Sequence, residues 1–557
     1  MLDGPALHDG HILPLIGLRA RQRGGDPAVS FVLDGSGATR TLTWSEVEAG
    51  AWRARHALEA RGLRPGDRVV LAMPTSATYL SALLGAMWGG LLPSTFCTLN
   101  GPATSPAVLA EWRAMVESFA PSLILGDDVP ASLDVPVLST TELELFDPGT
   151  APVQCYDELR ELAYIQFTSG STGRPRGLAL GWSGILANLR AIARCGPIEE
   201  DDSVVSWLPM YHDMGLFGSL LTGLHVGCRC VYMDSSLFAR NPFLWLRLLQ
   251  DHRATIAVVP PSALQRCIDL IRRRDAGLDL SSLRKILCGS EPIAPALIES
   301  FREVLVPRGV PETALKPVYG LAEATLAVTF PRPGRPPRMD RVRREAFDTS
   351  RRAEPAGPAE NDVHVWVSGG EPLPDVGLRI LGDDGETAPP RTVGTVLVRS
   401  PSVVLAFLEN GTLSPRSGEW LDTGDLGYLA DGELFVTGRR KDVIIKYGRN
   451  HSPDRLEQLA CLTDGVRHAA AFGVFEKATL TEKIVIIVEA RSKELSTPAS
   501  RDRLRLAVRG QLQDAGFAVD EIGLAPRGEL PRTTSGKIRR RHCRELYLES
   551  RLGDRLS

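Results

Sequence analysis

A run of small hydroxylated and flexible residues at 168–177 (TSGSTGRPRG) is the segment whose composition most directly predicts chemistry. Glycine lets backbone N–H groups converge on an anion, and hydroxyls add further donors. A flexible surface loop is the alternative, but an apolar run at 163–167 comes just before it and favours binding. No Gly-Lys-Ser/Thr follows, so this is not the P-loop of nucleoside triphosphatases. We expect it to hold a triphosphate through Thr168, Ser169, Gly170, Ser171, Thr172, Gly173 and Arg176.

At these residues the chain resembles the superfamily of adenylate-forming enzymes, in the acyl-CoA synthetase and fatty acyl-AMP ligase branch. Further motifs follow in the family's order, so the likeness covers nearly the whole chain. They are 207–215 (WLPMYHDMG, acyl pocket), 289–292 (GSEP) and 319–325 (YGLAEAT, adenine and magnesium), 423–425 (TGD, ribose), 438–442 (GRRKD, hinge) and 534–538 (TSGKI, catalytic lysine). The resemblance implies a ligase that activates a carboxylic acid as acyl-AMP and passes the acyl group to a thiol.

The residue types suit the nucleotide roles that the resemblance implies. Asp425 can accept hydrogen bonds from both ribose hydroxyls. Tyr319 offers a flat face for adenine. Glu323 is a hard oxygen ligand, suited to Mg²⁺ directly or through water. The resemblance adds further nucleotide-binding positions, which are Gly289, Ser290, Glu291, Pro292, Gly320 and Arg439.

The remaining motifs imply a two-step mechanism with domain alternation. Lys537 supplies a mobile ammonium for the carboxylate and the developing phosphate charge. His212 is expected to line the acyl pocket near the reacting carbonyl, although a lone histidine is more often structural. The family implies a hinge at Lys441 between an N-terminal domain at 1–438 and a mobile C-terminal domain at 439–557.

Arg176 stands where the family's phosphate loop carries a lysine. Arginine keeps the charge, but its guanidinium is wider, flatter and less mobile than an ammonium. An Arg-favouring genome is one explanation. The other explanation is that the loop binds the ATP β- and γ-phosphates less well. Thiolation of preformed acyl-AMP would then be unaffected, because acyl-AMP lacks these phosphates. Three hypotheses therefore stand: a full two-step ligase, an enzyme limited to one half-reaction, and a non-catalytic adenylate-binding protein.

The thiol acceptor is open between CoA and a phosphopantetheinyl carrier protein. Residues 331–361 are rich in Pro, Arg and Glu, and we expect a long surface loop or insertion there. Together with residues 447–451 they resemble fatty acyl-AMP ligases, in which an insertion restrains the small domain. Few apolar side chains are available for that contact, chiefly Met339, Val342 and Phe347. The substrate is expected to be a hydrophobic acid because Leu216, Phe217 and Leu220 follow the acyl-pocket motif.

Alternating apolar runs and helical patterns predict layers of parallel sheet covered by helices. Residues 43–63 are typical of an amphipathic helix opening at a Thr/Ser cap, and 68–73 of a buried strand. We expect an α/β fold: a large N-terminal domain of layered α/β with a β-barrel-like subdomain, and a small mobile α+β C-terminal domain.

Bulk composition excludes several function classes. The 557 residues carry a net charge of −3, which gives no argument for nucleic acid or an anionic membrane as partner. No run approaches the ~20 apolar residues of a membrane helix. The nine cysteines are scattered without zinc-site spacing. We expect reduced thiols, a cytoplasmic location, and no signal peptide.

Overall fold

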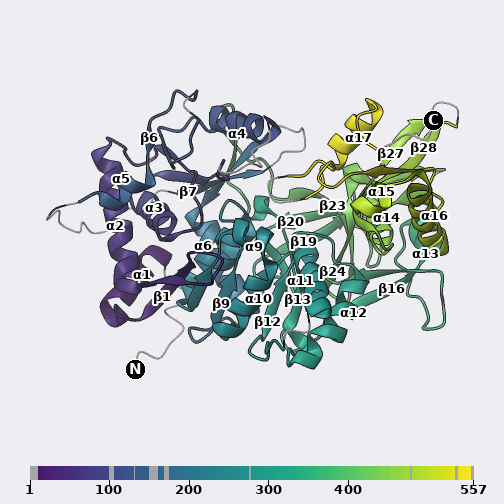
Figure 1. Ribbon diagram of the computed structural model, residues 1–557, viewed down its shortest axis with the longest axis horizontal. Coiled ribbons are helices and arrows are strands. Elements are labelled where there is room, and N and C mark those ends of the chain that lie inside the picture. Colours follow the sequence, from purple (N-terminus) through teal and green to yellow (C-terminus); the bar gives the residue numbers. More distant parts are fainter. Residues whose placement is uncertain are drawn as a thin grey trace.

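The computed structural model describes residues 11–99, 106–130, 132–147, 149, 161–168, 175–274, 277–447, 449–476, 479–533 and 537–553. A large lobe holds most of the chain, and a smaller lobe formed by the C-terminal segment lies at one end of it (Figure 1). This is the mixed α/β architecture that the sequence predicts.

The central sheet of the large lobe runs in the order β13-β12-β11-β9-β10-β1-β2, parallel from β13 to β1 and antiparallel at β2. Strands β9 and β11 are buried along their whole length, as expected of a sheet covered on both faces. The strands are β1 (Pro27–Val32), β2 (Thr39–Thr43), β9 (Ser203–Ser206), β10 (Arg229–Tyr232), β11 (Ile256–Val259), β12 (Lys285–Cys288) and β13 (Leu315–Pro317).

Two further sheets of the large lobe lie beside this one. The parallel sheet β4-β3-β5-β6 is formed by β3 (Arg68–Leu71), β4 (Leu92–Thr95), β5 (Leu123–Leu125) and β6 (Val137–Leu138). The antiparallel sheet β22-β21-β8-β7 is formed by β7 (Leu162–Thr168), β8 (Arg176–Gly181), β21 (Ala406–Glu409) and β22 (Thr412–Pro415). The strands predicted at 68–73 and 163–167 are thus confirmed to within a few residues.

Helices cover both faces of the sheets. The predicted amphipathic helix is α2, which begins after a Thr43–Glu46 capping box and buries Val47, Ala51 and Leu58. The helices of the large lobe are α1 (Ile12–Arg23), α2 (Trp44–Ala60), α3 (Ala77–Trp88), α4 (Pro106–Phe119), α5 (Thr140–Leu145), α6 (Trp182–Cys195), α7 (Asp213–Gly215), the π-helix η1 (Leu216–Leu221), α8 (Thr222–Val226), α9 (Ser235–Arg240), α10 (Pro242–Asp251), α11 (Pro261–Arg274), α12 (Pro295–Val304), and the 3₁₀ turns η2 (Val306–Arg308), η3 (Glu312–Ala314) and η4 (Ala322–Ala324).

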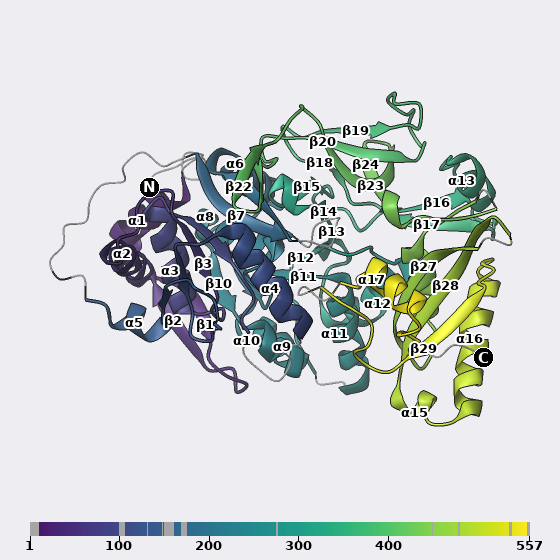
Figure 2. The same cartoon turned by 90° about the horizontal axis from the view of Figure 1, so that it is seen from above.

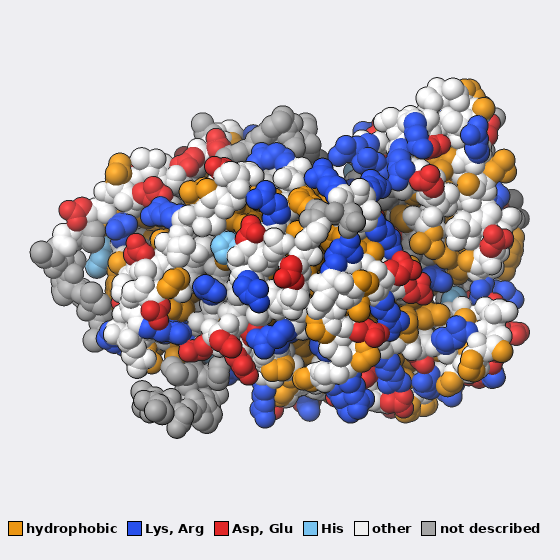
Figure 3. Space-filling model, turned by 60° about the horizontal axis from the view of Figure 1, so that its bottom comes forward, with side chains coloured by type: hydrophobic (Ala, Val, Ile, Leu, Met, Phe, Trp, Pro, Cys, Tyr) orange, Lys and Arg blue, Asp and Glu red, His pale blue; other side chains and the backbone are white. Residues whose placement is uncertain are grey.

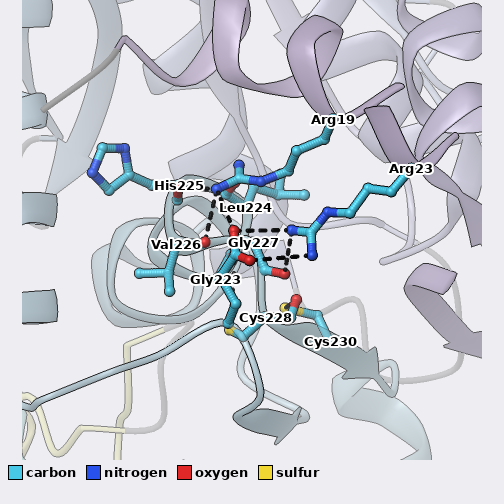
Figure 4. Close-up of polar contacts among 10 residues, drawn as sticks. Arg19, Arg23, Gly223, Leu224, His225, Val226, Gly227, Cys228 and Cys230 are labelled. Atoms are coloured by element: carbon cyan, nitrogen blue, oxygen red, sulfur yellow. Dashed lines mark hydrogen bonds and ion pairs between the residues drawn. The ribbon is translucent and has the colours of Figure 1, made fainter. Parts of the chain in front are cut away.

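Buried Arg19 fixes the segment that follows the acyl-pocket motif. Its guanidinium donates to the carbonyl oxygens of Leu224, His225 and Val226 at 2.7–2.9 Å, where α8 ends (Figure 4). A helix C-terminus leaves carbonyls without partners and carries partial negative charge, so a cation there satisfies both. Burial lowers the pKa of Arg19 to about 10. Helix α1 is therefore tied to the continuous run α7–η1–α8.

An antiparallel region connects the large lobe to the small one. Its main sheet has the open order β19-β20-β23-β24, so a four-stranded antiparallel sheet stands where a β-barrel-like subdomain was expected. The strands are β14 (Tyr319–Gly320), β15 (Ala327–Phe330), β18 (Glu371–Pro372), β19 (Gly377–Leu381), β20 (Gly394–Arg399), β23 (Leu421–Ala430) and β24 (Glu433–Arg439).

The expected loop at 331–361 is wrong in part, because the segment contains regular structure. Strand β16 (Met339–Arg343) pairs with β17 (Val363–Val367), and helix α13 (Arg344–Ser350) follows β16. Val342 is fully buried, and buried Asp340 accepts a hydrogen bond from Tyr428 at 2.8 Å. On the inner face of β16, buried Asp340 occupies a position that an apolar side chain usually fills. A search for hydrophobic periodicity therefore did not reveal the strand.

The small lobe packs helices onto the three-stranded arrangement β27-β28-β29 (Figure 2). Ile484, Ile486 and Val488 of β28 are fully buried in its core. The elements are η5 (Arg440–Asp442), β25 (Ile444–Lys446), β26 (Arg449–His451), α14 (Pro453–Cys461), β27 (Val466–Glu476), β28 (Thr481–Ala490), α15 (Ser492–Leu495), α16 (Pro498–Asp514), β29 (Glu521–Ala525) and α17 (Arg540–Leu548).

Within the described ranges, none of the helices has both the length and the apolar character needed to cross a membrane.

Candidate functional site

Asp425 is held between two residues of the predicted nucleotide site. The hydroxyl of Tyr319 on β14 donates to Asp425 Oδ2 at 2.7 Å. Arg439 is the cross-strand partner of Asp425 in the β23–β24 pair, and its Nε lies 3.0 Å from Asp425 Oδ1. Asp425 itself is only 6% exposed. The structure therefore brings together three residues that are far apart in sequence.

Glu323, Asp425 and Asp213 influence one another electrostatically. Burial raises the pKa of Glu323, and the charges of Asp213 and Asp425 raise it further, against the opposing effect of Arg439. Burial also raises the pKa of Asp425, although Arg439 and the Tyr319 hydroxyl favour its ionised form. Carboxylates close enough to raise one another's pKa create a region that favours a cation.

His212 lies beside this acidic region and is paired with its neighbour in the chain. Its Nδ1 is 2.6 Å from Oδ1 of Asp213, the first residue of α7. Burial opposes ionisation of Asp213, but His212 and Lys537 outweigh it and lower the pKa of Asp213. The sequence analysis did not single out Asp213, although it adjoins His212 in the acyl-pocket motif.

Lys537 lies shortly before helix α17 in the small lobe. Arg532 and Ile538 form an antiparallel bridge. Inside it, the N–H of Thr533 donates to the carbonyl of Lys537 at 2.8 Å, and the Lys537 N–H donates to Thr533 Oγ1 at 3.1 Å. The charge of Lys537 lowers the pKa of both Asp213 and Asp425. The lysine of the small lobe thus lies within electrostatic reach of the acids of the large lobe.

Backbone strain occurs in both adenine-motif segments. Ser290 has φ +77°, and Thr325 has φ +67° and ψ −58°. The Leu326 N–H donates to the Ala324 carbonyl at 2.8 Å, so Thr325 is the central residue of a strained γ-turn two residues after Glu323. A Cβ on Gly320 would come within 1.9 Å of the Leu326 carbonyl oxygen. Strain held by surrounding structure is frequent at functional sites.

The GSEP segment follows β12 and is partly used for structure. Gly289 is buried, and a Cβ there would lie 2.8 Å from the Val318 carbonyl oxygen. The carboxylate of Glu291 accepts from the N–H and the hydroxyl of Ser262, both at 3.0 Å, near the start of α11. Pro292 is exposed. The side chain of Glu291 is therefore engaged at a helix terminus, a role that the motif did not indicate.

The predicted phosphate loop lies in the sequence between β7 and β8, and Thr168 pairs with Arg176 across these two strands. Ser169, Gly170, Ser171, Thr172 and Gly173 lie outside the described residues. Arg176 is directed onto the neighbouring strand β21. Its Nε is 2.9 Å from Glu409 Oε1, and its guanidinium carbon is 3.5 Å from the centre of the Phe407 ring.

The predicted hinge residue Lys441 is exposed in the 3₁₀ turn η5, directly after β24. Ion pairs hold the residues on either side of it. Arg440 lies 2.8 Å from Asp422 of the large lobe, and Asp442 lies 3.0 Å from Arg540 of the small lobe. The chain at this position is thus anchored to both lobes.

The donor set near Glu323 fits a magnesium ion held mainly by its substrate. Among the side chains that the structure describes, no group of three or more His, Cys, Asp or Glu could hold a metal ion. Mg²⁺ characteristically takes one or two carboxylates and otherwise uses water and substrate phosphates. A half-buried carboxyl such as Glu323, whose pKa is raised by its surroundings and further by neighbouring acids, matches that pattern.

Known proteins resemble this chain over most of its length. The profile of a family described as AMP-binding enzyme matches residues 18–408. The chain is 34% identical over 575 residues to the long-chain-fatty-acid–AMP ligase FadD26 of Mycobacterium marinum, with 97% of each chain covered. It is 31% identical to the long-chain-fatty-acid–AMP ligase FadD23 of Mycobacterium tuberculosis, with 93% of each covered.

Solved structures of similar chains cover nearly its full length. One from structural and functional studies of fatty acyl-adenylate ligases from E. coli and L. pneumophila has a TM-score of 0.88 at 30% identity, with 98% of both chains covered. A fatty acyl-adenylate ligase from L. pneumophila, in complex with acyl adenylate and pyrophosphate, has a TM-score of 0.74 at 28% identity and the same coverage.

Proposed function

Because the chain belongs to the family of AMP-binding enzymes and is an acid–thiol ligase, we propose that it activates a long-chain fatty acid as acyl-AMP and delivers the acyl group to a carrier-protein phosphopantetheine. One observation carries the proposal. Asp425 is held by Tyr319 and Arg439 within electrostatic reach of Lys537, which the small lobe supplies.

In the first half-reaction a carboxylate oxygen of the acid attacks the α-phosphorus of ATP, and pyrophosphate leaves. Asp425 accepts hydrogen bonds from the ribose and so fixes the nucleotide. The ammonium of Lys537 offsets the negative charge that the attacking carboxylate and the phosphate share in the transition state. Glu323 would hold Mg²⁺, which offsets phosphate charge when bound.

In the second half-reaction the thiol attacks the acyl carbonyl carbon, the bond to the phosphate oxygen breaks, and AMP leaves. The Nδ1 side of His212 is directed at Asp213, which orients the ring beside the acyl-pocket segment. Leu216, Phe217 and Leu220 of that segment are buried, which supports an apolar acid. Lys441 between its two anchored neighbours supports a change of lobe arrangement between the two steps, with the domain boundary near residue 438.

Contacts of the insertion support a carrier protein over CoA as the acceptor. The guanidinium carbon of Arg344 lies 5.4 Å from the ring centre of Phe517 in the small lobe, and His364 lies 6.3 Å from the same ring. Phe347 of α13 stacks on Trp366 with the ring centres 5.4 Å apart, and so supports the part of the insertion that contacts Phe517. Such contacts favour the present lobe arrangement and oppose the rearrangement that a free thiol cofactor needs.

A second candidate is an enzyme that thiolates acyl-AMP made elsewhere. The contacts of Arg176 with Glu409 and Phe407 favour it, because they direct the loop's cation toward β21. Acyl-AMP carries no β- or γ-phosphate, so this arrangement would leave thiolation intact.

One experiment separates these functions. The protein is incubated with ATP, Mg²⁺ and fatty acids of graded chain length, and in parallel with synthetic acyl-AMP, each with CoA or holo-carrier. The proposed function predicts pyrophosphate release and acyl transfer to the carrier from both starting points. Turnover of acyl-AMP alone would favour the second candidate. Adenylate binding without turnover from either would instead indicate a non-catalytic binding protein.

A further inference from the structure

Two consecutive arginines, Arg539 and Arg540, come directly after Ile538 and contact different lobes. Arg540 binds acids of its own lobe: its Nε lies 2.7 Å from Glu457, and its Nη1 lies 3.0 Å from Asp442. Arg539 instead crosses to the large lobe, where its Nη1 lies 3.5 Å from Oε2 of Glu111 on α4. The side chain of Arg539 is 28% exposed, and that of Glu111 is 16% exposed.

The two arginines stand at the start of a helix: Ile538 bridges to Arg532, Arg539 is the residue before α17, and Arg540 is the first residue of α17. Ile538 packs against the core of the small lobe, and Arg540 joins its acids. Lys537 and Arg539 face the large lobe, the first toward Asp213 and Asp425 and the second toward Glu111. Fixing Arg539 therefore fixes Lys537 two residues away.

Glu111 occupies a rigid position close to the phosphate-loop hairpin. The next residue, Trp112, is 1% exposed, and Phe119 is fully buried, in a cluster that includes Ile165 of β7 and Ala179 of β8. Helix α4 thus packs on β7 and β8, the two strands on either side of the predicted triphosphate loop. The segment before α17 reaches toward α4 in both ribbon views, and Lys and Arg side chains gather where the lobes meet (Figures 1, 2 and 3).

We propose that the Glu111–Arg539 ion pair docks the segment 537–540 onto the large lobe for acyl-AMP formation, so that Glu111 and Arg539 are positioning residues of the first half-reaction. The inference rests on the proposed function. Among the residues that the structure describes, the side chains of Glu111 and Arg539 pair with each other, outside the group formed by Tyr319, Asp425 and Arg439. The pair acts by holding Lys537 over the acids, and it is not required once acyl-AMP has formed and the lobes rearrange.

Charge reversal and charge exchange test the pair. Glu111→Arg and Arg539→Glu are each expected to lower kcat for ATP-dependent acyl-AMP formation about fivefold or more, with KM for ATP nearly unchanged. The exchanged double variant is expected to recover most of the lost rate. Thiolation of synthetic acyl-AMP is expected to change less than about twofold in all three. The control exchanges Arg541 and Glu545, which form a 3.1 Å pair within α17 and do not join the lobes.

A second readout keeps the test independent of turnover. Amide hydrogen exchange in 106–119 and 526–548 is expected to speed up in both single variants and to return toward the wild-type rate in the exchanged protein. No change in exchange, no recovery in the double variant, or equal loss in both half-reactions would overturn the inference. A wild-type protein that forms no acyl-AMP would overturn the proposed function instead, while the exchange data would still decide whether the pair docks the lobes.

Discussion

Arg176 and Glu409 form an ion pair between neighbouring strands, with Arg176 Nε 2.9 Å from Glu409 Oε1 and the guanidinium stacked on Phe407. Planarity makes this double contact possible, because an ammonium cannot stack in the same way. The arginine at this position is thus more than a substitute for lysine. It joins the phosphate-loop hairpin to β21.

Arg176→Lys is expected to raise the rate of ATP-dependent acyl-AMP formation relative to thiolation of synthetic acyl-AMP. A lysine loses the stack on Phe407, and its mobile ammonium becomes available to the β- and γ-phosphates. Single-turnover pyrophosphate release measures the first rate. Arg399→Lys, in an exposed 2.6 Å pair with Glu419, is the matched control. An unchanged or lower ratio of the two rates would mean that the contact between Arg176 and Glu409 does not limit acyl-AMP formation.

Asp425→Asn is expected to weaken AMP binding about tenfold or more while leaving the fold at least as stable. The amide keeps an acceptor for Tyr319 but loses the charge that strengthens the ribose contacts. Because burial raises the pKa of Asp425, its ionisation opposes folding as pH rises above the unfolded value of 3.8, and the neutral amide removes that cost. Titration calorimetry and thermal unfolding measure the two effects. Asp422→Asn, in the exposed pair with Arg440 on the same strand, should leave AMP affinity unchanged.

The motifs predicted the family and the fold, which the comparisons confirm, but they did not predict several contacts. Glu111 and Glu409 have roles that depend on which side chain faces them across the fold, and no local spacing encodes that, whereas Asp213 pairs with its neighbour His212 inside a recognised motif and was still missed. Glu291 lies inside a recognised motif yet binds Ser262. The strand and helix within 331–361 were missed because buried Asp340, with its partner Tyr428, takes a place that an apolar residue usually fills.

Arg19→Ala is expected to lower the free energy of unfolding by about 3–5 kcal/mol, because the carbonyls of Leu224, His225 and Val226 lose a buried charged donor. Urea denaturation followed by fluorescence measures it. Arg23→Ala is the comparison, since Arg23 is more exposed, pairs with half-exposed Glu200 and donates to one carbonyl at this terminus, that of Gly227 at 3.2 Å, so it should cost less than about 1 kcal/mol. Equal losses in the two variants would contradict a special role for the α8 terminus.

Arg344→Gln is expected to raise the rate of acyl transfer to free CoA about two- to tenfold, since it removes the cation that lies against Phe517 and so weakens the contact between insertion and small lobe. Transfer to holo-carrier is compared in the same preparation. The neighbouring Arg343→Gln serves as control, because Arg343 pairs with Glu360 inside the insertion at 3.0 Å. If both variants gave the wild-type CoA rate, the insertion would not set the choice of acceptor.

His468 on β27 is expected to make the free energy of unfolding depend on pH in the mildly acidic range. Burial, with the positive charge of Arg532, lowers the pKa of His468 to about 4. Arg467 of the small lobe and Arg266 of the large lobe act in the same direction, and Glu489 opposes them. Between the unfolded value of 6.5 and the folded value, the unfolded chain binds a proton that the folded chain does not. The free energy of unfolding should therefore fall as pH drops through this window, by up to about 1.4 kcal/mol per pH unit from this one group.

His468→Gln is expected to reduce that acid sensitivity, because glutamine does not titrate. Urea unfolding at pH 7 and pH 5 gives the slope for each protein, and His542→Gln on exposed α17 provides the comparison. The decisive quantity is the difference between the two pH values, since the substitution also changes packing at both. A slope in His468→Gln equal to that of the wild type would show that protonation elsewhere governs the acid response, and that the cations around His468 are separated from it in solution.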